Sequence, residues 1–493
     1  MSTDRAGAAR GWALAAALAL LWGVGCAWVP LREGGLIGQP YTDLYPAVWG
    51  LWWFMGEQPG LPLFSERLAA PGGMPFYYSS PLHGWFGWPL EAVSGLTAAW
   101  NGGVLAARVA TVLCAYGAGR AWGLKPAGAL VAAAVYGASP FFQGFAVEGI
   151  VEGTDGWALA AWLWAAGRRR YVLAAPLFAL AVLSSWYYAA CACLLAVPMG
   201  PRVWAGAAGG LAMAAPALWA FLGAFPAREA LDPAVRAAMG TSLIPQEPGI
   251  KSGLNPFAKT SWIGLIAPAL ALWTARSRPR VAAVIAGMWL LSLGRGPVFE
   301  LPPFSSLRFP YRLHAGTLAG LALLAGLGAD RLRFGAWLAP AVLLEGLLLS
   351  PIEPLLPASP AAAPAIYDAA PDGAVLLDLP GPVATPPGAI NRSRPRARWF
   401  LHAQTAYDGA TPWRPDFNSV GVSAGDDGLD GARALDPLER RPSPDVLALP
   451  PAIDAVMVHR RELKSRALDA ARLLEAEGWV RAAADEERWL YLR

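Results

Sequence analysis

Apolar runs of near-membrane length, separated by turns that carry arginine, constrain the fold of this chain more than any other feature. About eleven such runs occur, near residues 12–31, 99–119, 126–146, 156–167, 171–185, 187–199, 203–225, 261–275, 281–294, 311–328 and 334–351. A helix needs about 20 mainly apolar residues to cross a bilayer, so the shorter runs must extend beyond their apolar cores. Only 15% of the 493 residues are charged, against about 25% in a typical soluble chain. We therefore expect an α-helical polytopic membrane domain over residues 1–353.

The basic residues between the runs predict the orientation of the chain. They fall on one side of the expected spans, at Arg5, Arg10, Arg120, Lys125, Arg168, Arg169, Arg170, Arg202, Arg276, Arg278, Arg280, Arg331 and Arg333. By the positive-inside rule this side is cytoplasmic, which places the N-terminus there. The partition requires Trp85–Ala98 to be an interfacial helix and makes residues 32–98 a long first exoplasmic loop. The first run is long enough to span, so we expect a retained anchor rather than a cleaved signal peptide.

The stretch Leu36–Leu90 within this loop is too interrupted by Pro and Gly to span, and it is rich in aromatic residues. At its head lies the acidic residue Asp43. The residues that follow predict a short helix lying flat in the headgroup region, through Val48, Trp49, Trp52, Trp53 and Met55. A carboxylate held there suits chemistry on a lipid headgroup. The alternative is an ordinary aromatic belt with a solvated Asp.

A second acidic cluster lies between the third and fourth runs, at Glu148, Glu152 and Asp155. The spacing of Glu148 and Glu152 predicts that they share a helical face. Asp155 alone reads most simply as the N-cap of the next helix. One carboxylate is enough to cap a helix, so capping does not explain the two glutamates beside Asp155. Carboxylates at membrane depth indicate function.

A third cluster, Arg308, Arg312 and His314, enters the tenth run. Guanidinium groups bind phosphate through two parallel hydrogen bonds, so we expect these residues, with His83 of the first loop, to bind a lipid phosphate. The alternative is that the arginines snorkel to lipid headgroups. The three clusters together suit group transfer from a lipid-linked phosphate. A carboxylate would take the proton of an acceptor hydroxyl while Arg or a divalent metal stabilises the phosphate.

The composition changes after the last run. Residues 354–364 read as a Pro/Ala linker, and residues 365–493 as a small soluble α/β domain on the exoplasmic side. Ala374–Leu379, Ala455–His459 and Arg488–Leu492 predict strands, and Glu462–Gly478 has helical spacing. This domain contains no nucleophile elbow, phosphate-binding loop or dinucleotide fingerprint. The four cysteines lie in apolar segments and read as core residues rather than disulfides or metal ligands.

These features resemble the GT-C superfamily of multi-spanning glycosyltransferases, which includes protein O-mannosyltransferases, lipid A aminoarabinose transferases and oligosaccharyltransferases. The resemblance rests on Asp43 in a long first loop, on Ser80-Pro81-Leu82 and Ala138-Ser139-Pro140, and on the acidic second loop at Glu148–Asp155. The segment Leu307–Arg312 is similar to one in bacterial members that carry a C-terminal exoplasmic α/β domain.

The resemblance implies a glycosyltransferase of a bacterial plasma membrane and cell envelope that moves a sugar from a polyprenyl-phosphate donor to a glycan, lipid or protein acceptor. It gives Asp43 the role of catalytic base or metal contact, with Glu148, Glu152 and Asp155 competing for the second-loop role. If a divalent metal such as Mg or Mn is used, Asp43, Glu148 and Glu152 are its expected ligands. The rival hypotheses are a lipid-linked oligosaccharide flippase and an inactive GT-C-like scaffold for envelope assembly. The small net charge of +4 gives no indication of nucleic-acid binding.

Overall fold

The computed structural model describes residues 2–40, 42–57, 64–76, 78, 80–224, 233–242, 257–301, 304–307, 309–381, 399–413, 429–437 and 443–493. The chain divides into two compact units. The first unit comprises Met1–Gln39, Ser79–Trp219 and Ala230–Ser359, and the second comprises Pro40–Tyr78, Ala220–Glu229 and Pro360–Arg493. Asp43 therefore belongs to the second unit, whereas the acidic and basic clusters of the later runs belong to the first.

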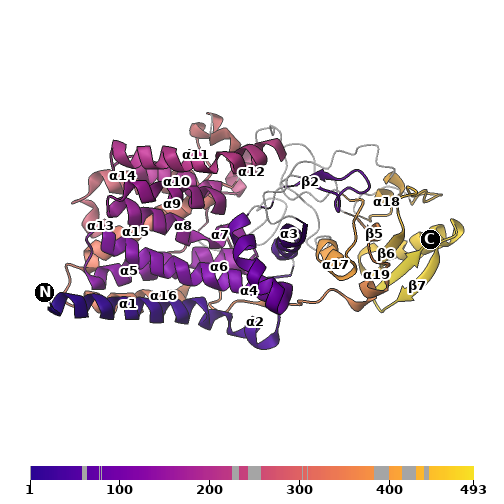
Figure 1. The fold of residues 1–493 in the computed structure, drawn as a ribbon, viewed down its shortest axis with the longest axis horizontal. Helices are drawn as coiled ribbons and strands as arrows, with labels where there is room; N and C mark the ends of the chain where they lie inside the picture. Colours follow the sequence, from indigo (N-terminus) through magenta and orange to yellow (C-terminus); the bar gives the residue numbers. More distant parts are fainter. Residues whose placement is uncertain are drawn as a thin grey trace. The chain divides into compact units, whose positions relative to one another are not determined.

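The first unit is a helical bundle (Figure 1). Its α-helices are α1 (Ser2–Gly23), α2 (Trp28–Glu33), α4 (Pro81–Ala121), α5 (Pro126–Gly137), α6 (Pro140–Val147), α7 (Val151–Thr154), α8 (Gly156–Gly167), α9 (Tyr171–Ser184), α10 (Trp186–Ala196), most of α11 (Pro201–Ala224), α12 (Pro233–Ala238), α13 (Ile266–Ala275), α14 (Pro279–Ser292), α15 (His314–Ala329) and α16 (Leu338–Leu349). Short 3-10 turns are η1 (Gly25–Ala27), η2 (Pro297–Glu300), η3 (Phe304–Ser306), η4 (Pro310–Leu313) and η5 (Gly335–Trp337). Strands β1 (Leu36–Ile37) and β4 (Ala358–Ser359) pair antiparallel, so the predicted Pro/Ala linker is partly packed.

Four helical stretches of the described residues are long and apolar enough to cross a membrane: Gly7–Glu33, Pro81–Ala121, Pro126–Val147 and Pro310–Ala329. Shorter apolar helices are Tyr171–Ser184, Trp186–Ala196, Ile266–Ala275, Pro279–Ser292 and Gly335–Leu349. Each apolar run of the sequence coincides with helix. The chain is thus an integral membrane protein, and the number of about eleven spans stays a prediction.

Helix α4 joins the predicted interfacial helix and the following span into one element. Gly95 has φ 78° and ψ 177° and divides α4 into two arms, because only glycine adopts this conformation without strain. On the first arm, Phe86 is 61% and Val93 84% exposed. These apolar side chains suit the interfacial position expected for this arm.

Helices α5 and α15 meet through two glycines. A Cβ atom added to Gly128 would lie 2.3 Å from the carbonyl oxygen of Gly326, and one added to Gly326 would lie 2.5 Å from that of Gly128. Such small residues let helix backbones approach closely in a membrane. The Asp330 carboxylate, after α15, accepts from the N–H of Lys125 at 2.7 Å and of Gly128 at 2.8 Å, so it caps α5.

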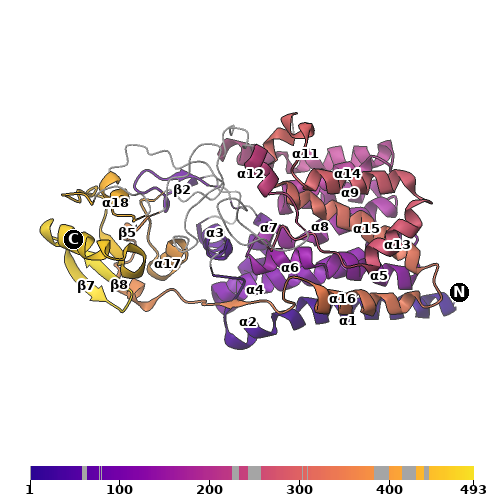
Figure 2. The same cartoon turned by 180° about the vertical axis from the view of Figure 1, so that it is seen from behind.

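Two further charged side chains, one buried and one half-buried, form hydrogen bonds with the backbone at helix ends in the first unit. Glu345 of α16 accepts from the N–H groups of Leu265 and Ile266, at 2.6 and 3.2 Å, where α13 begins. Arg108 of α4 donates from Nη2 to the carbonyl oxygen of Trp22 at 2.9 Å, at the end of α1. Residues of α1 and η1 also pack against Leu343, which lies on α16 alongside α1 (Figure 2).

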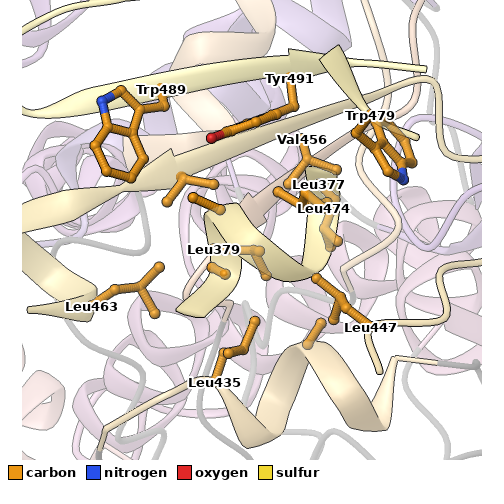
Figure 3. Close-up of a cluster of buried hydrophobic side chains, with 14 of the residues drawn as sticks. Leu377, Leu379, Leu435, Leu447, Val456, Leu463, Leu474, Trp479, Trp489 and Tyr491 are labelled. Carbon is orange, nitrogen blue, oxygen red and sulfur yellow. The ribbon is translucent and has the colours of Figure 1, made fainter. Parts of the chain in front are cut away.

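The second unit contains a four-stranded mixed sheet of order β5-β6-β8-β7. Its strands are β5 (Leu376–Leu379), β6 (Ala455–His459), β7 (Val480–Ala484) and β8 (Arg488–Leu492); β5 and β6 are parallel and the other pairs antiparallel. The sequence predicted three of these strands and missed β7, whose residues are mostly exposed. Helix α20 (Arg466–Ala476) covers one face, where Leu474 packs with Leu377, Val456 and Tyr491 (Figure 3).

The opposite face of the sheet is covered by η6 (Ala365–Ala369) and α17 (Trp399–Tyr407). Tyr367 of η6 donates its hydroxyl to Asp378 Oδ1, and the same oxygen lies 2.9 Å from His459 Nε2. All three side chains are buried. This network fastens η6 to the parallel strands β5 and β6. The unit is completed by α18 (Asp430–Ala434), α19 (Arg460–Leu463), the hairpin of β2 (Phe64–Ser65) with β3 (Met74–Pro75), and α3 (Leu44–Glu57).

Candidate functional site

The acidic turn between α6 and α8 departs from its predicted geometry. Helix α6 ends at Val147, and Gly149 takes a left-handed conformation with φ 67° before α7 begins at Val151. The expectation that Glu148 and Glu152 share a helical face is therefore wrong, because the glycine ends the helix between them. Their side chains enter different environments.

Asp155 is a buried carboxyl group between α7 and α8. Its Oδ2 accepts from Ser80 Oγ at 3.3 Å and its Oδ1 from Trp157 Nε1 at 3.0 Å. Asp155 occupies the N-cap position of α8, as the sequence predicted, but its side chain makes no capping hydrogen bond to that helix. Burial raises the pKa of Asp155 to about 7; the bonds from Trp157 and Ser80 oppose this rise and the charge of Glu152 adds to it. A carboxyl group with this pKa can exchange protons near neutral pH.

Glu152 forms an ion pair with Arg312. Arg312 Nη2 lies 2.9 Å from Glu152 Oε1, and the two side chains are 11% and 17% exposed. The guanidinium group also lies over the rings of Phe309, at 4.7 Å from the centroid, and Tyr187, at 5.5 Å. Among the described residues Arg312 Nη1 has no hydrogen-bond partner. Arg312 is therefore rigidly held and retains donors with which to bind an anion.

Two adjacent tyrosines of α10 tie the acidic turn to the segment that carries Arg312. Tyr188 donates its hydroxyl to the carbonyl oxygen of Gly153, and the Phe309 N–H donates to the Tyr187 hydroxyl at 2.8 Å. The sequence reasoning missed these tyrosines, because no motif distinguishes them from other aromatic residues of an apolar helix. It also missed that Ser80 contacts Asp155.

Glu148 is fully buried and faces the backbone of residues 257–258. Its Oε1 accepts from the N–H of Phe257 at 2.6 Å and of Ala258 at 3.4 Å, and among the described residues its Oε2 has no partner. Burial raises the pKa of Glu148 to about 8, against the lowering effects of these N–H groups and of Lys259. Burial likewise lowers the pKa of Lys259 to about 8. Glu148 thus anchors a loop in the structure.

The two histidines proposed for phosphate binding are buried inside the bundle. His314 is 0% exposed and packs edge-on against Phe141, with centroids 5.2 Å apart. His83 is 2% exposed, and its ring occupies the space beside Gly103. Arg308 lies outside the described residues.

Asp43 precedes α3 in the second unit, and its carbonyl oxygen accepts from the Ala47 N–H at 3.0 Å. The predicted helix is present, but most of its aromatic residues do not lie in a headgroup layer. Trp49 is 0% and Trp53 1% exposed, and both pack against Phe76 of the same unit. The sequence shows the aromatic residues but not the protein surface that covers them.

Two of the three carboxylates expected to bind a metal are engaged by other groups in the first unit, and the metal site stays a prediction. Glu152 is paired with Arg312, and Glu148 is enclosed by backbone N–H groups. Within the described ranges, no three His, Cys, Asp or Glu side chains converge as metal ligands would.

No known family matches the sequence of this chain, and no curated protein matches it. Among solved structures, the apo form of the oligosaccharyltransferase of Archaeoglobus fulgidus matches with a TM-score of 0.56 and 12% identity, over 91% of this chain and 69% of that chain. The two chains share a fold. Because the identity is so low, this similarity concerns architecture alone.

Two further similarities are weaker. They are to the arabinofuranosyltransferase AftD from Mycobacteria, with a TM-score of 0.48 and 17% identity over 98% of this chain and 41% of that chain, and to the Archaeoglobus enzyme in complex with Zn and sulfate, with a TM-score of 0.47, 12% identity, and coverage of 98% and 73%. These structural neighbours are GT-C-type glycosyltransferases.

Proposed function

We propose that this protein is a membrane glycosyltransferase that transfers a sugar from a polyprenyl-phosphate donor to an acceptor hydroxyl. The observation that carries the proposal is the cluster of Arg312, Glu152 and Asp155 in the first unit. It combines a cation restrained by Phe309 and Tyr187 with a carboxyl group whose pKa is about 7. The fold shared with an oligosaccharyltransferase is compatible with this activity as an analogy of architecture.

The reaction exchanges one C–O bond for another. The acceptor oxygen forms a bond to the anomeric carbon while the bond from that carbon to the phosphate oxygen breaks. The acceptor proton passes to a carboxylate, and the electron pair of the broken bond stays on polyprenyl phosphate. Within the first unit, we assign Arg312 the role of stabilising the departing phosphate and Asp155 that of proton exchange. Asp43 of the second unit keeps the role of base as a hypothesis from the sequence.

The roles of the other candidates follow from their surroundings. Glu152 orients Arg312 through the ion pair, and Glu148 anchors residues 257–258. The rings of His83 and His314 are buried, so we leave them outside the phosphate site. The rival hypothesis, a lipid-linked oligosaccharide flippase, predicts charged residues that pair with one another deep within several spans. The deep charge Arg108 instead bonds a backbone carbonyl at the end of α1, which is a capping role.

The proposal is tested by incubating the purified protein with a panel of polyprenyl-phosphate-linked pentoses and hexoses, in the presence of glycan, lipid and protein acceptors, and measuring released polyprenyl phosphate. We expect release with at least one donor, and a loss of about 10² or more in Asp43→Asn. Release that is unchanged in Asp43→Asn would remove this residue from the mechanism. Absence of release from every donor would reject the activity.

The phosphate role of Arg312 has a separate test in the binding of polyprenyl phosphate. Arg312→Ala should weaken binding by roughly 1.5–3 kcal/mol, the range for charge-assisted hydrogen bonds, and Arg312→Lys should rescue only partly. Arg331→Ala is the matched control. Arg331 follows the opposite end of α15 and also lies over an aromatic ring, that of Trp273 at 5.9 Å. Equal affinity of Arg312→Ala and the wild type would show that Arg312 is structural.

A further inference from the structure

Helix α3, which begins directly after Asp43, is held by α17 of the same unit. The Trp49 indole Nε1 donates to Gln404 Oε1 at 2.8 Å, across 355 residues of sequence. Both side chains are 0% exposed. A buried hydrogen bond of this kind has a narrow geometry and costs free energy if either partner is lost. It therefore fixes the position of α3 on α17.

A second contact between these helices lies one turn closer to Asp43. The ring of Tyr45 stacks on that of His402, with centroids 4.8 Å apart and an interplanar angle of 23°. The Tyr45 hydroxyl donates to the carbonyl oxygen of Pro360 at 3.1 Å, and His402 Nε2 lies 3.0 Å from that of Ala361. Burial lowers the pKa of His402, so its ring is neutral at physiological pH.

The remainder of the first loop is fastened to the chain that follows α17. Ala69 and Ala70 donate their N–H groups to Trp413 and Thr411, at 3.1 and 3.0 Å, and Thr411 donates back to Arg67 at 2.9 Å. Arg67 Nη1 also lies 2.9 Å from Asp408 Oδ1. The first loop is thus bound to the C-terminal part of the chain at two places, through α3 and through residues 67–70.

We infer that α17 is the positioning element of the first-loop carboxylate, with Gln404 and His402 as positioning residues for Asp43. The inference rests on the proposed role of Asp43 and gives the C-terminal residues a part in turnover. Asp43 lies two residues from Tyr45, and its carbonyl oxygen is bonded into the first turn of α3. A shift of α3 on α17 must therefore move Asp43. Displacing a catalytic group by about 1 Å can cost 10²-fold in rate.

The first variant to measure is Gln404→Leu in the full-length protein. We expect kcat to fall about 10-fold or more while the KM for the lipid donor changes less than about 2-fold, because donor binding is assigned to other residues. Hydrogen–deuterium exchange of residues 44–57, measured without ligand, should become faster. Gln404→Glu retains an acceptor oxygen for Trp49 and should recover most of kcat.

Tyr407→Phe is the matched control. Tyr407 lies on the same helix but packs among the residues that cover the sheet, and its hydroxyl has no partner among the described residues. We expect this variant to keep both kcat and the exchange rate of α3. If Gln404→Leu fails to fold, His402→Phe, which keeps the stacked ring, and His402→Ala, which removes it, provide the same comparison.

The outcomes separate the inference from the proposed function. Full turnover in Asp43→Asn would refute the role of Asp43. Loss of turnover in Asp43→Asn together with wild-type kcat in Gln404→Leu and His402→Ala would overturn the positioning role alone. A fall in kcat as large in Tyr407→Phe as in Gln404→Leu would also overturn it, because the effect would then be one of general stability.

Discussion

Replacing Glu148 by Gln should abolish a loss of folding stability that grows as the pH rises. Glutamine keeps the Oε1 acceptor for the N–H groups of Phe257 and Ala258 but carries no ionisable proton. The wild-type carboxyl is fully buried, and burial raises its pKa from 4.5 to about 8. The folded chain therefore keeps a proton on Glu148 at pH values where the unfolded chain has lost it.

The sign and size of the effect follow from proton linkage. Where the folded state binds more protons than the unfolded state, stability falls as pH rises, by about 1.4 kcal/mol per pH unit for one group. The loss begins above the ordinary pKa of 4.5 and ends near the folded pKa of about 8. At pH 7 it amounts to ~3 kcal/mol at most. Above pH 8 the lowered pKa of Lys259 reverses the slope, because the folded state then binds fewer protons.

Apparent melting temperatures of purified wild type and Glu148→Gln, measured in detergent from pH 5 to 8, test this reasoning. The two proteins should melt together near pH 5, and the variant should melt higher as pH rises. Glu148→Leu separates the hydrogen bonds from the ionisation. It should be less stable at every pH, by roughly 1–3 kcal/mol, because two N–H groups lose their acceptor. Parallel pH profiles for wild type and Glu148→Gln would refute the argument.

Four other predictions concern the proton-exchanging carboxyl, the topology, the second unit and the helix packing. The pH profile of kcat/KM should rise through about pH 7 in the wild type, and Asp155→Asn should lack this limb. Reporters active only in the cytoplasm should work after Lys125 and be silent after Arg493; the reverse would overturn the orientation. Asp378→Asn should cost about 1–3 kcal/mol in thermal unfolding, because a shared acceptor of Tyr367 and His459 is altered. Gly128→Val should lower the melting temperature markedly, whereas the same change at Gly7, where an added Cβ meets nothing within 4 Å, should not.

The sequence predicted the helices of the apolar runs and three of the four strands of the larger sheet because their signals are local. An apolar run of sufficient length predicts a helix wherever that helix packs, and short apolar runs located β5, β6 and β8. The candidate site was harder to predict. A single glycine, Gly149, separated two glutamates whose spacing indicated a common face. No local signal shows that Arg312 pairs with Glu152, because these residues lie 160 positions apart.

The aromatic residues after Asp43 also show what sequence composition cannot predict. Their composition is typical of a membrane interface, and the sequence assigned them to lipid headgroups. In the structure Trp49 and Trp53 are covered by residues of their own unit, and Trp49 bonds Gln404. Amphipathic rings suit both surroundings, so composition alone does not distinguish a lipid contact from a protein contact.

The cap that Asp330 places on α5 has a consequence for biogenesis. The N–H groups of Lys125 and Gly128 receive their carboxylate from a residue 205 and 202 positions later in the chain. At about 5–20 residues per second, a ribosome makes the intervening segment in ~10–40 s. During that interval the start of α5 must find water, lipid headgroups or an insertion factor as its acceptor. Maturation of this helix pair is therefore a late, post-insertion event, and chains released before residue 330 lack the means to complete it.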